Sequence, residues 1–376
     1  MASATFDHRG PSLTIYRCGN RGYGGPTVEK GDGRPLGVAN GRPAVHGKRT
    51  GRPEMFATLV HADWSAHPSK RWIALAKRRA RGWAVSSLSA VGPSHEYLAW
   101  LFAAACEGPV LAGFDFPIGL PSFFGARIDQ TNFRVALGVF GGGRWSSFYR
   151  VANEPGEIAL ERPFYPRHAD RGTRQVDLLR AHGVATINDL RRRCEVRTPV
   201  RLAACPLFWT LGPNQVGKAA ITGWQEILAP AVARGAGIWP FDGDLHILAQ
   251  AHRLVIAETY PAEAYHHLNI GFARHESKRR MKDRARRASA IFAWASAYGV
   301  SFLPMIHQWI DSGCGVDRLG EDRFDALLGL LAMIEVAEGR RSDGAPDDEP
   351  IRRWEGWILG QTTSGSPALP GQSPAS

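Results

Sequence analysis

Three apolar stretches that each end in a carboxylate are the feature that most constrains the fold of this chain. They are residues 56–65 (FATLVHADWS), 109–121 (PVLAGFDFPIGLP) and 253–261 (RLVIAETYP), with Asp63, Asp115 and Glu258 as the acids. Short apolar runs that are bounded by turn residues predict buried strands. Because a carboxylate buried without a partner costs several kcal/mol, three of them at strand ends indicate a shared compensating cation.

Four further segments complete an alternating pattern of strands and helices. Residues 71–79 and 82–91 are separated by a short turn and, together with the first stretch, predict three antiparallel strands. Residues 95–108 and 321–339 predict helices from their apolar periodicity. This pattern predicts an α/β fold, in which ligands gather at the carboxyl ends of the strands.

Two more aspartates open the last predicted helix. Asp322 and Asp325 are three residues apart, which places them on one face of the first turn, where the helix dipole favours negative charge. Asp325 also falls in the apolar stripe of that helix, so we favour it over Asp322 as a metal ligand. Each acid taken alone also has a simpler interpretation. Asp115 could accept hydrogen bonds from backbone N–H groups in its turn, and Asp322 could be a helix cap.

Carboxylates from several elements suit Mg²⁺ or Mn²⁺, because these hard cations prefer oxygen ligands and keep some of their waters. Two such ions about 4 Å apart activate a water and stabilise the leaving oxygen of a phosphodiester. The acids at the strand ends and on the last helix therefore predict a site for Mg²⁺ or Mn²⁺.

An excess of positive charge accompanies these acids. The chain has 46 Lys and Arg against 35 Asp and Glu, which gives a net charge of +11. This charge favours binding to nucleic acid, although a GC-rich coding sequence would produce the same excess. Residues 274–299 predict a helix with a basic first half that contacts phosphates through Lys278, Arg279, Arg280, Lys282 and Arg286. The alternative for this segment is a solvated helix face.

The organisation of the remaining chain follows from composition. We expect a disordered basic segment or a misassigned start at 1–54, a folded domain at 55–360 with an insertion or cap at about 122–250, and a disordered tail at 361–376. The five cysteines form no C-x-x-C pair, and the chain has neither an apolar leader nor an apolar run of 18 residues. These features predict a cytoplasmic protein without a membrane segment.

Three smaller features have plain interpretations. Residues 188–197 (NDLRRRCEVR) predict a basic helix. LGPNQVGKAA has the spacing of a phosphate-binding loop, but Ala219 stands where such a loop needs Ser or Thr, so we interpret Lys218 as part of an ordinary helix start. His61 shares a strand face with Asp63, and we interpret it as a packed histidine.

Five pieces of the sequence occur in a specific order over residues 56–360. They are VHADWS, GFDFPIGLP, AETYPAEAY, DRFDALLG and EGWIL. Together they resemble the domain-of-unknown-function family number 429, whose members are predicted to be RNase H-like nucleases. The resemblance implies a mixed five-stranded sheet with helices on both faces and metal-dependent phosphodiester hydrolysis. It implies that Asp63, Asp115, Glu258 and Asp325 bind the metal and carry catalysis, with Asp322 adjacent.

These observations give one leading hypothesis and two rivals. The leading hypothesis is a nuclease that hydrolyses DNA or RNA with Mg²⁺ or Mn²⁺ at the carboxylate site. The first rival is a nucleic-acid-binding scaffold of the same fold without catalysis, whose affinity falls with salt. The second rival is a metal-dependent phosphotransferase or phosphoesterase that acts on small phosphate compounds. Because one fold hosts many activities, the fold alone does not choose among them.

Overall fold

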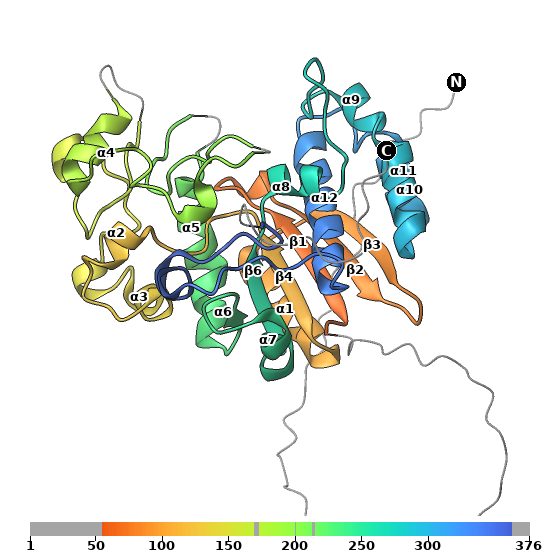
Figure 1. The fold of residues 1–376 in the computed structure, drawn as a ribbon, viewed down its shortest axis with the longest axis horizontal. Coiled ribbons are helices and arrows are strands. Elements are labelled where there is room, and N and C mark those ends of the chain that lie inside the picture. Colours follow the sequence, from red (N-terminus) through yellow and green to blue (C-terminus); the bar gives the residue numbers. More distant parts are fainter. Residues whose placement is uncertain (1–54, 169–172, 200, 213–214, 363–376) are drawn as a thin grey trace, which may run out of the picture.

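A seven-stranded sheet is the central element of the computed structural model, which describes residues 55–168, 173–199, 201–212 and 215–362 (Figure 1). The expectations for residues 1–54 and 363–376 lie outside the described residues. The strands are β1 (Thr58–Asp63), β2 (Trp72–Arg78), β3 (Trp83–Ala90), β4 (Val110–Phe114), β5 (Gly237–Ile238), β6 (Leu254–Glu258) and β7 (Val300–Phe302).

The strand order is β5-β6-β4-β1-β2-β3-β7, and β2 alone of these runs antiparallel to its neighbours. The α/β prediction is confirmed, and the five expected strands are the five inner ones. The sequence pattern missed β5 and β7 because strands of two or three residues are too short to show a period. The parallel strands β1, β4 and β6 end together at one edge, which is where the predicted acids lie.

Twelve α-helices surround the sheet within the described residues. They are α1 (Ser94–Glu107), α2 (Ser122–Gly125), α3 (Phe133–Val139), α4 (Gln175–His182), α5 (Gly217–Gly223), α6 (Ala229–Ala233), α7 (Leu245–Ala251), α8 (Pro261–His267), α9 (Met281–Ala285), α10 (Ala288–Tyr298), α11 (Pro304–Asp311) and α12 (Gly320–Ala337). None of the helices in these ranges has the length and apolarity that a bilayer crossing requires.

The helix α12 covers one face of the sheet and contacts β1, β2 and α8. The leucines of α12 are all buried, although they lie on different sides of the helix, as expected for a helix inside the core. Truncating one of them to alanine lowers the free energy of unfolding by roughly 2–5 kcal/mol. Gly329 allows the close approach to β1, because a Cβ atom there would lie 2.2 Å from Cε1 of His61. The position of α12 over β1 therefore fixes where its acidic first turn lies.

The opposite face carries α1 and the helices of the predicted insertion. Figure 1 shows residues 122–236 as a lobe on one side of the sheet, with α9 to α12 gathered on the other. The lobe has an aromatic core in which Phe124 packs against Phe148 and Phe208. At the end of the expected insertion of about 122–250, β5 pairs with β6, and α7 packs beside β6.

Two helix predictions need correction. Residues 188–197 contain a single 3-10 turn at Arg193–Glu195, because the side chains of Arg192, Cys194 and Glu195 are all buried in the protein interior. In the basic segment, α9 begins only at Met281, so the first three predicted phosphate contacts precede the helix. The helix expected after Lys218 is confirmed: α5 and α6 are joined by a π-helical turn at Trp224–Leu228.

Candidate metal site at the strand ends

Asp63 and Asp115 form the centre of the site, at the carboxyl ends of β1 and β4. Their side chains are hydrogen-bonded to each other, and the backbone N–H of Trp64 donates to Oδ1 of Asp115 at 2.6 Å. Burial and the charge of Asp115 raise the pKa of Asp63 well above its ordinary value. Burial also raises the pKa of Asp115 to about 7, although the hydrogen bonds from Trp64 and Asp63 oppose this effect. The two carboxyl groups therefore share a proton near neutral pH.

The first turn of α12 adds Asp322 and Asp325 to this pair. Asp325 is 5% exposed, and its charge raises the pKa of both Asp63 and Asp115. Burial and the charge of Asp325 raise the pKa of Asp322 to about 6. We call these four residues the aspartate cluster. The structure thus brings together four of the five acids that the sequence predicted.

One lysine and one tyrosine hold Asp325 in place. Nζ of Lys278 donates to Oδ2 of Asp325 at 2.6 Å and lies 3.2 Å from Oε1 of Glu321. The hydroxyl of Tyr265 donates to Oδ1 of Asp325. Burial opposes the charge of Lys278, but Asp325 and Glu321 raise the pKa of Lys278 above its ordinary value. A single ammonium group therefore compensates part of the negative charge of the cluster.

Strand register explains why the aspartates meet. Ala62 of β1 pairs with Phe114 of β4, and both point to the face opposite α12. Because side chains alternate along a strand, Asp63 and Asp115 at the next level point to the α12 face. At the end of β6, the residue at this level is Thr259, not Glu258.

His61 lies beneath the aspartates and ties three elements together. Its Nδ1–H donates to the carbonyl oxygen of Ala326 at 3.0 Å, and its Nε2 accepts from Oγ1 of Thr259 at 2.8 Å. Burial lowers the pKa of His61 to about 4, so the ring is neutral at physiological pH. The interpretation of His61 as a packed histidine is confirmed, and its role is to fix β1 against α12.

Glu258 lies apart from the aspartate cluster, contrary to expectation. It pairs in register with Phe114, one level before Asp115, and therefore points to the opposite face of the sheet. There its two oxygens accept from Nη1 and Nη2 of Arg192, each at 2.6 Å, and Oε2 also accepts from the N–H of Ile118 at 2.6 Å. Because an internal arginine already compensates its charge, we leave Glu258 out of the metal site.

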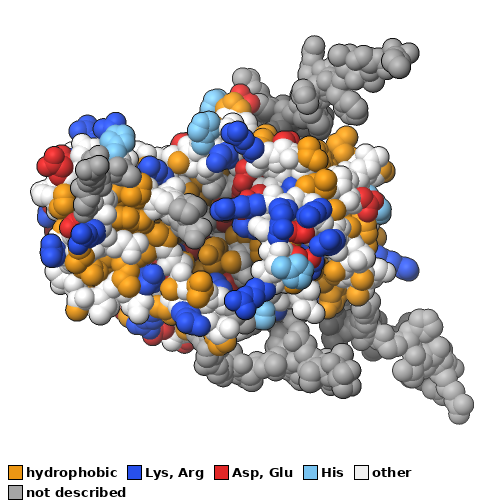
Figure 2. All heavy atoms as spheres, turned by 90° about the horizontal axis from the view of Figure 1, so that it is seen from above, with side chains coloured by type: hydrophobic (Ala, Val, Ile, Leu, Met, Phe, Trp, Pro, Cys, Tyr) orange, Lys and Arg blue, Asp and Glu red, His pale blue; other side chains and the backbone are white. Residues whose placement is uncertain are grey.

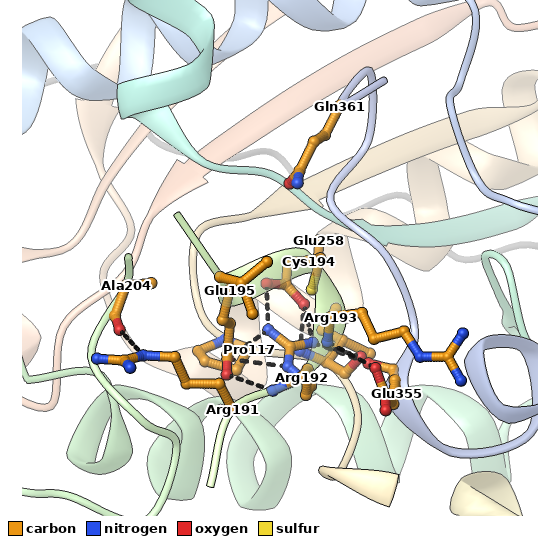
Figure 3. Close-up of polar contacts among 12 residues, drawn as sticks. Pro117, Arg191, Arg192, Arg193, Cys194, Glu195, Ala204, Glu258, Glu355 and Gln361 are labelled. Atoms are coloured by element: carbon orange, nitrogen blue, oxygen red, sulfur yellow. Dashed lines mark hydrogen bonds and ion pairs between the residues drawn. The ribbon is translucent and has the colours of Figure 1, made fainter. Parts of the chain in front are cut away.

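Arg192 organises a second, separate group of carboxylates (Figure 3). Its side chain is completely buried, and its Nε donates to Oε1 of Glu195 at 2.9 Å. Its Nη1 also donates to the carbonyl oxygen of Glu355 at 3.0 Å, and the carboxylate of Glu355 accepts from the N–H of Arg193 at 2.6 Å. We call Arg192, Glu195, Glu258 and Glu355 the glutamate–arginine cluster. It joins the lobe, β6 and the C-terminal EGWIL segment.

Residues 63–350 match the model of a family described as a protein of unknown function, DUF429. The chain belongs to the DUF429 family. The matched range begins at Asp63 and includes the whole aspartate cluster, together with Arg192 and Glu258. No curated protein and no solved structure matches the chain.

The basic segment of this DUF429 member is largely neutralised by carboxylates of its own and of α12. Four of the predicted phosphate contacts form the ion pairs Lys278–Asp325 at 2.6 Å, Arg280–Asp283 at 2.7 Å, Arg286–Asp283 at 3.3 Å and Arg279–Glu321 at 3.9 Å. Of the five predicted phosphate contacts, only Lys282 has no ion pair within the described residues. The contact of this segment with nucleic acid stays a prediction, and Lys278 acts on the aspartate cluster instead.

The sequence interpretation missed Thr259, Tyr265 and Arg192. The first two lie in AETYPAEAY, so the signal was present in a motif that we had already singled out. Arg192 left no signal, because its partner Glu258 is 66 residues away in the chain. Lys218 behaves as expected: it is the second residue of α5, and no strand precedes it within residues 201–212.

The donor set of the DUF429 site suits one kind of metal. Within the described ranges, no three His, Cys, Asp or Glu side chains are grouped closely enough to hold a metal ion by themselves. A closed tetrahedral zinc cage is therefore not present in this part of the chain. Mg²⁺ and Mn²⁺ need fewer protein ligands than a zinc cage. Mg²⁺ keeps several of its waters and binds one or two carboxylates together with substrate phosphates. Asp63 and Asp115 fit this requirement, since a cation would replace the proton that they share.

Proposed function

We propose that this DUF429 protein is a divalent-metal-dependent nuclease whose metal binds at the aspartate cluster. The observation that carries the proposal is the convergence of four aspartates with one ammonium group among them. Burial and the charge of Asp325 raise the pKa of Asp115 to about 7 and that of Asp322 to about 6. Strongly perturbed carboxyl groups at strand ends are typical of functional sites.

The five inner strands support an RNase H-like interpretation. They form a mixed sheet with helices on both faces, which is the architecture that the family resemblance implies. The positions of Asp63, Asp115 and Asp325 agree with that interpretation. The RNase H-like activity is part of our proposal, because the fold alone does not determine the activity.

In this proposal, each residue of the cluster has a distinct role. Asp63 and Asp115 would hold the cation through their carboxylates, and the hydrogen bond from Trp64 fixes the orientation of Asp115. Tyr265 would fix the orientation of Asp325, whose charge Lys278 partly compensates. When bound, the cation supplies Lewis-acid stabilisation for the charge on the phosphate.

The test is cleavage of end-labelled single- and double-stranded DNA, RNA and an RNA–DNA hybrid in Mg²⁺, Mn²⁺ or EDTA. We expect metal-dependent cleavage that falls at least about 100-fold in Asp63→Asn and Asp115→Asn, because metal ligands contribute at least this much. The matched control is Glu258→Gln, which removes a predicted ligand that lies on the other face. Cleavage that survives in both aspartate variants would contradict the proposal.

A specific observation also favours the non-catalytic scaffold. Lys278 already places a cation beside Asp325 at 2.6 Å, so an internal ammonium group takes part of the role of a metal. The scaffold predicts binding of nucleic acid that is unchanged in Asp63→Asn and no cleavage with any metal. The cleavage experiment therefore separates the two functions.

A further inference from the structure

A cavity of about 730 Å³ opens beside the aspartate cluster, on the side of the lobe. Four cationic side chains line it, together with Tyr149 and Ile221. The cations are Arg150, Arg162, Arg167 and Lys218. We call this cavity the lobe pocket. Figure 2, which looks down on the strand ends, shows the surface hollowed between the lobe and the part that carries α9 to α12, with Lys and Arg side chains around the hollow.

One residue connects the lobe pocket to the aspartate cluster. The backbone N–H of Trp64 donates to Asp115, and its indole Nε1 donates to Oγ1 of Thr222 at 3.1 Å. Thr222 lines the pocket, as does Ala66, which follows Asp63 by three residues. A ligand in the pocket would therefore lie next to the proposed metal site.

The charges of the lobe pocket differ from those of the basic segment. Arg150, Arg167 and Lys218 form no ion pair within the described residues, whereas Arg162 contacts Oε1 of Glu157 at 3.0 Å. Unpaired cations that converge on a concave surface attract an anion. Because the basic segment is neutralised internally, the lobe pocket is the stronger candidate for contacts with phosphate.

Two hydrogen-bond donors at the pocket also lack an acceptor. The hydroxyl of Tyr149 and Nε of Arg162 are buried and have no hydrogen-bond partner among the described residues. A buried donor without an acceptor costs about 1–3 kcal/mol, so this wall of the pocket is not optimised for the stability of the fold alone. Tyr149 and Ile221 add an apolar wall against which a planar ring packs.

We propose that the lobe pocket binds one nucleotide unit of a single-stranded nucleic acid. Its phosphate would contact Arg150, Arg167 and Lys218, and its base would pack against Tyr149 and Ile221. A volume of about 730 Å³ suits one nucleotide, whereas a duplex presents its phosphates on a convex surface that cannot enter a pocket. The inference rests on the proposed function, because the nucleotide in the lobe pocket would belong to the strand whose phosphodiester reaches Asp63 and Asp115.

The test measures binding without metal, so that catalysis has no part in it. The full chain in EDTA is titrated onto short labelled single-stranded DNA or RNA, with a duplex and adenosine monophosphate as competitors, at several salt concentrations. The pocket variant is Arg150→Ala with Lys218→Ala. The matched control is Arg279→Ala with Lys282→Ala, which removes the same charge from the exposed basic segment.

We expect the dissociation constant for the single strand to rise about tenfold in the pocket variant, with a salt slope smaller by about 1.4 for two lost phosphate contacts. The control should change the dissociation constant less than about twofold, and Lys218→Arg should retain binding. Equal weakening in both double variants, stronger competition by the duplex, or no binding of either single strand would overturn the proposal.

The two proposals fail in different ways. Pocket-dependent binding in EDTA without cleavage in any metal would keep the lobe pocket and reject the nuclease. Metal-dependent cleavage with the same KM in wild type and in the pocket variant would keep the nuclease and reject the pocket.

Discussion

Two groups of carboxylates lie at neighbouring strand ends of this protein, and they are stabilised in opposite ways. In the glutamate–arginine cluster, Arg192 is fully buried and donates to both oxygens of Glu258 at 2.6 Å. In the aspartate cluster, Asp63 and Asp115 are hydrogen-bonded to each other, and burial raises the pKa of both. The first arrangement is complete without a ligand, whereas in the second only Asp325 is paired with a cation, the ammonium group of Lys278.

This difference separates a structural site from a functional one. A buried charge that is paired and fully hydrogen-bonded joins elements of the fold and has no capacity left for a ligand. Carboxylates that are held together without compensation cost stability, and such strain persists where it serves binding or catalysis. We therefore propose that the aspartate cluster carries the chemistry and that the glutamate–arginine cluster attaches the lobe.

The largest effect is expected when the paired cluster is broken. Arg192→Met leaves Glu258 buried without its partner, so we expect the free energy of unfolding to fall by about 3–5 kcal/mol. The control is Arg193→Met, because the side chain of Arg193 is 49% exposed and, among the described residues, its ion pair is with Asp348. That exposed pair should contribute about 0–1 kcal/mol. Urea denaturation of both variants measures the difference, and equal losses would contradict the structural role of Arg192.

A smaller effect is expected in the pH dependence of the metal-free protein. Burial and neighbouring charge raise the pKa of Asp63, and burial raises that of Asp115 from 3.8 to about 7. The folded protein therefore binds these protons more tightly than the unfolded chain does. The resulting stability is present below about pH 4 and is lost as the pH rises through about 7.

The measurement for this prediction is the midpoint of thermal unfolding in EDTA from pH 4 to pH 8. Asp63→Asn should make the decline smaller, because the amide has no proton to lose and only Asp115 of the pair still titrates. At pH values above 7, Mg²⁺ should raise the unfolding midpoint of the wild type. If the decline is the same in wild type and Asp63→Asn, the carboxyl pair is not the source.

The smallest effect is expected at Lys278. Lys278→Met removes the ammonium group that compensates Asp325, so the affinity of the cluster for Mn²⁺ should rise by about three- to tenfold. Arg279→Met removes the same charge from a side chain that is 71% exposed and serves as the control. A loss of Mn²⁺ binding in Lys278→Met would mean that Lys278 builds the site and does not compete with the cation.

The sequence predicted much of the aspartate cluster because its signal is local. Asp63 and Asp115 each interrupt an apolar run, and the spacing of Asp322 and Asp325 places both on the first turn of α12. Glu258 has the same local pattern, but the sequence analysis wrongly placed it in the metal site. Its side chain points away because Phe114 pairs with Glu258 and not with Thr259, and this register depends on contacts between distant segments.

The glutamate–arginine cluster and the lobe pocket were beyond prediction for a related reason. The pattern of residues 188–197 resembles a helix, but the contact of Arg192 with Glu258 takes precedence over local helix preference. In the pocket, Arg150 and Lys218 come from parts of the lobe that no periodicity connects. A run of basic residues is easily seen in a sequence, whereas the carboxylates that neutralise it are visible only in the structure.

The most direct test of the central claim is a titration with Mn²⁺, with the free ion followed by electron paramagnetic resonance, for wild type, Asp63→Asn and Glu258→Gln. We predict that the wild type and Glu258→Gln bind Mn²⁺ with similar affinity and that Asp63→Asn loses at least about tenfold. Binding that is lost in Glu258→Gln but kept in Asp63→Asn would place the metal at the other cluster and contradict the account.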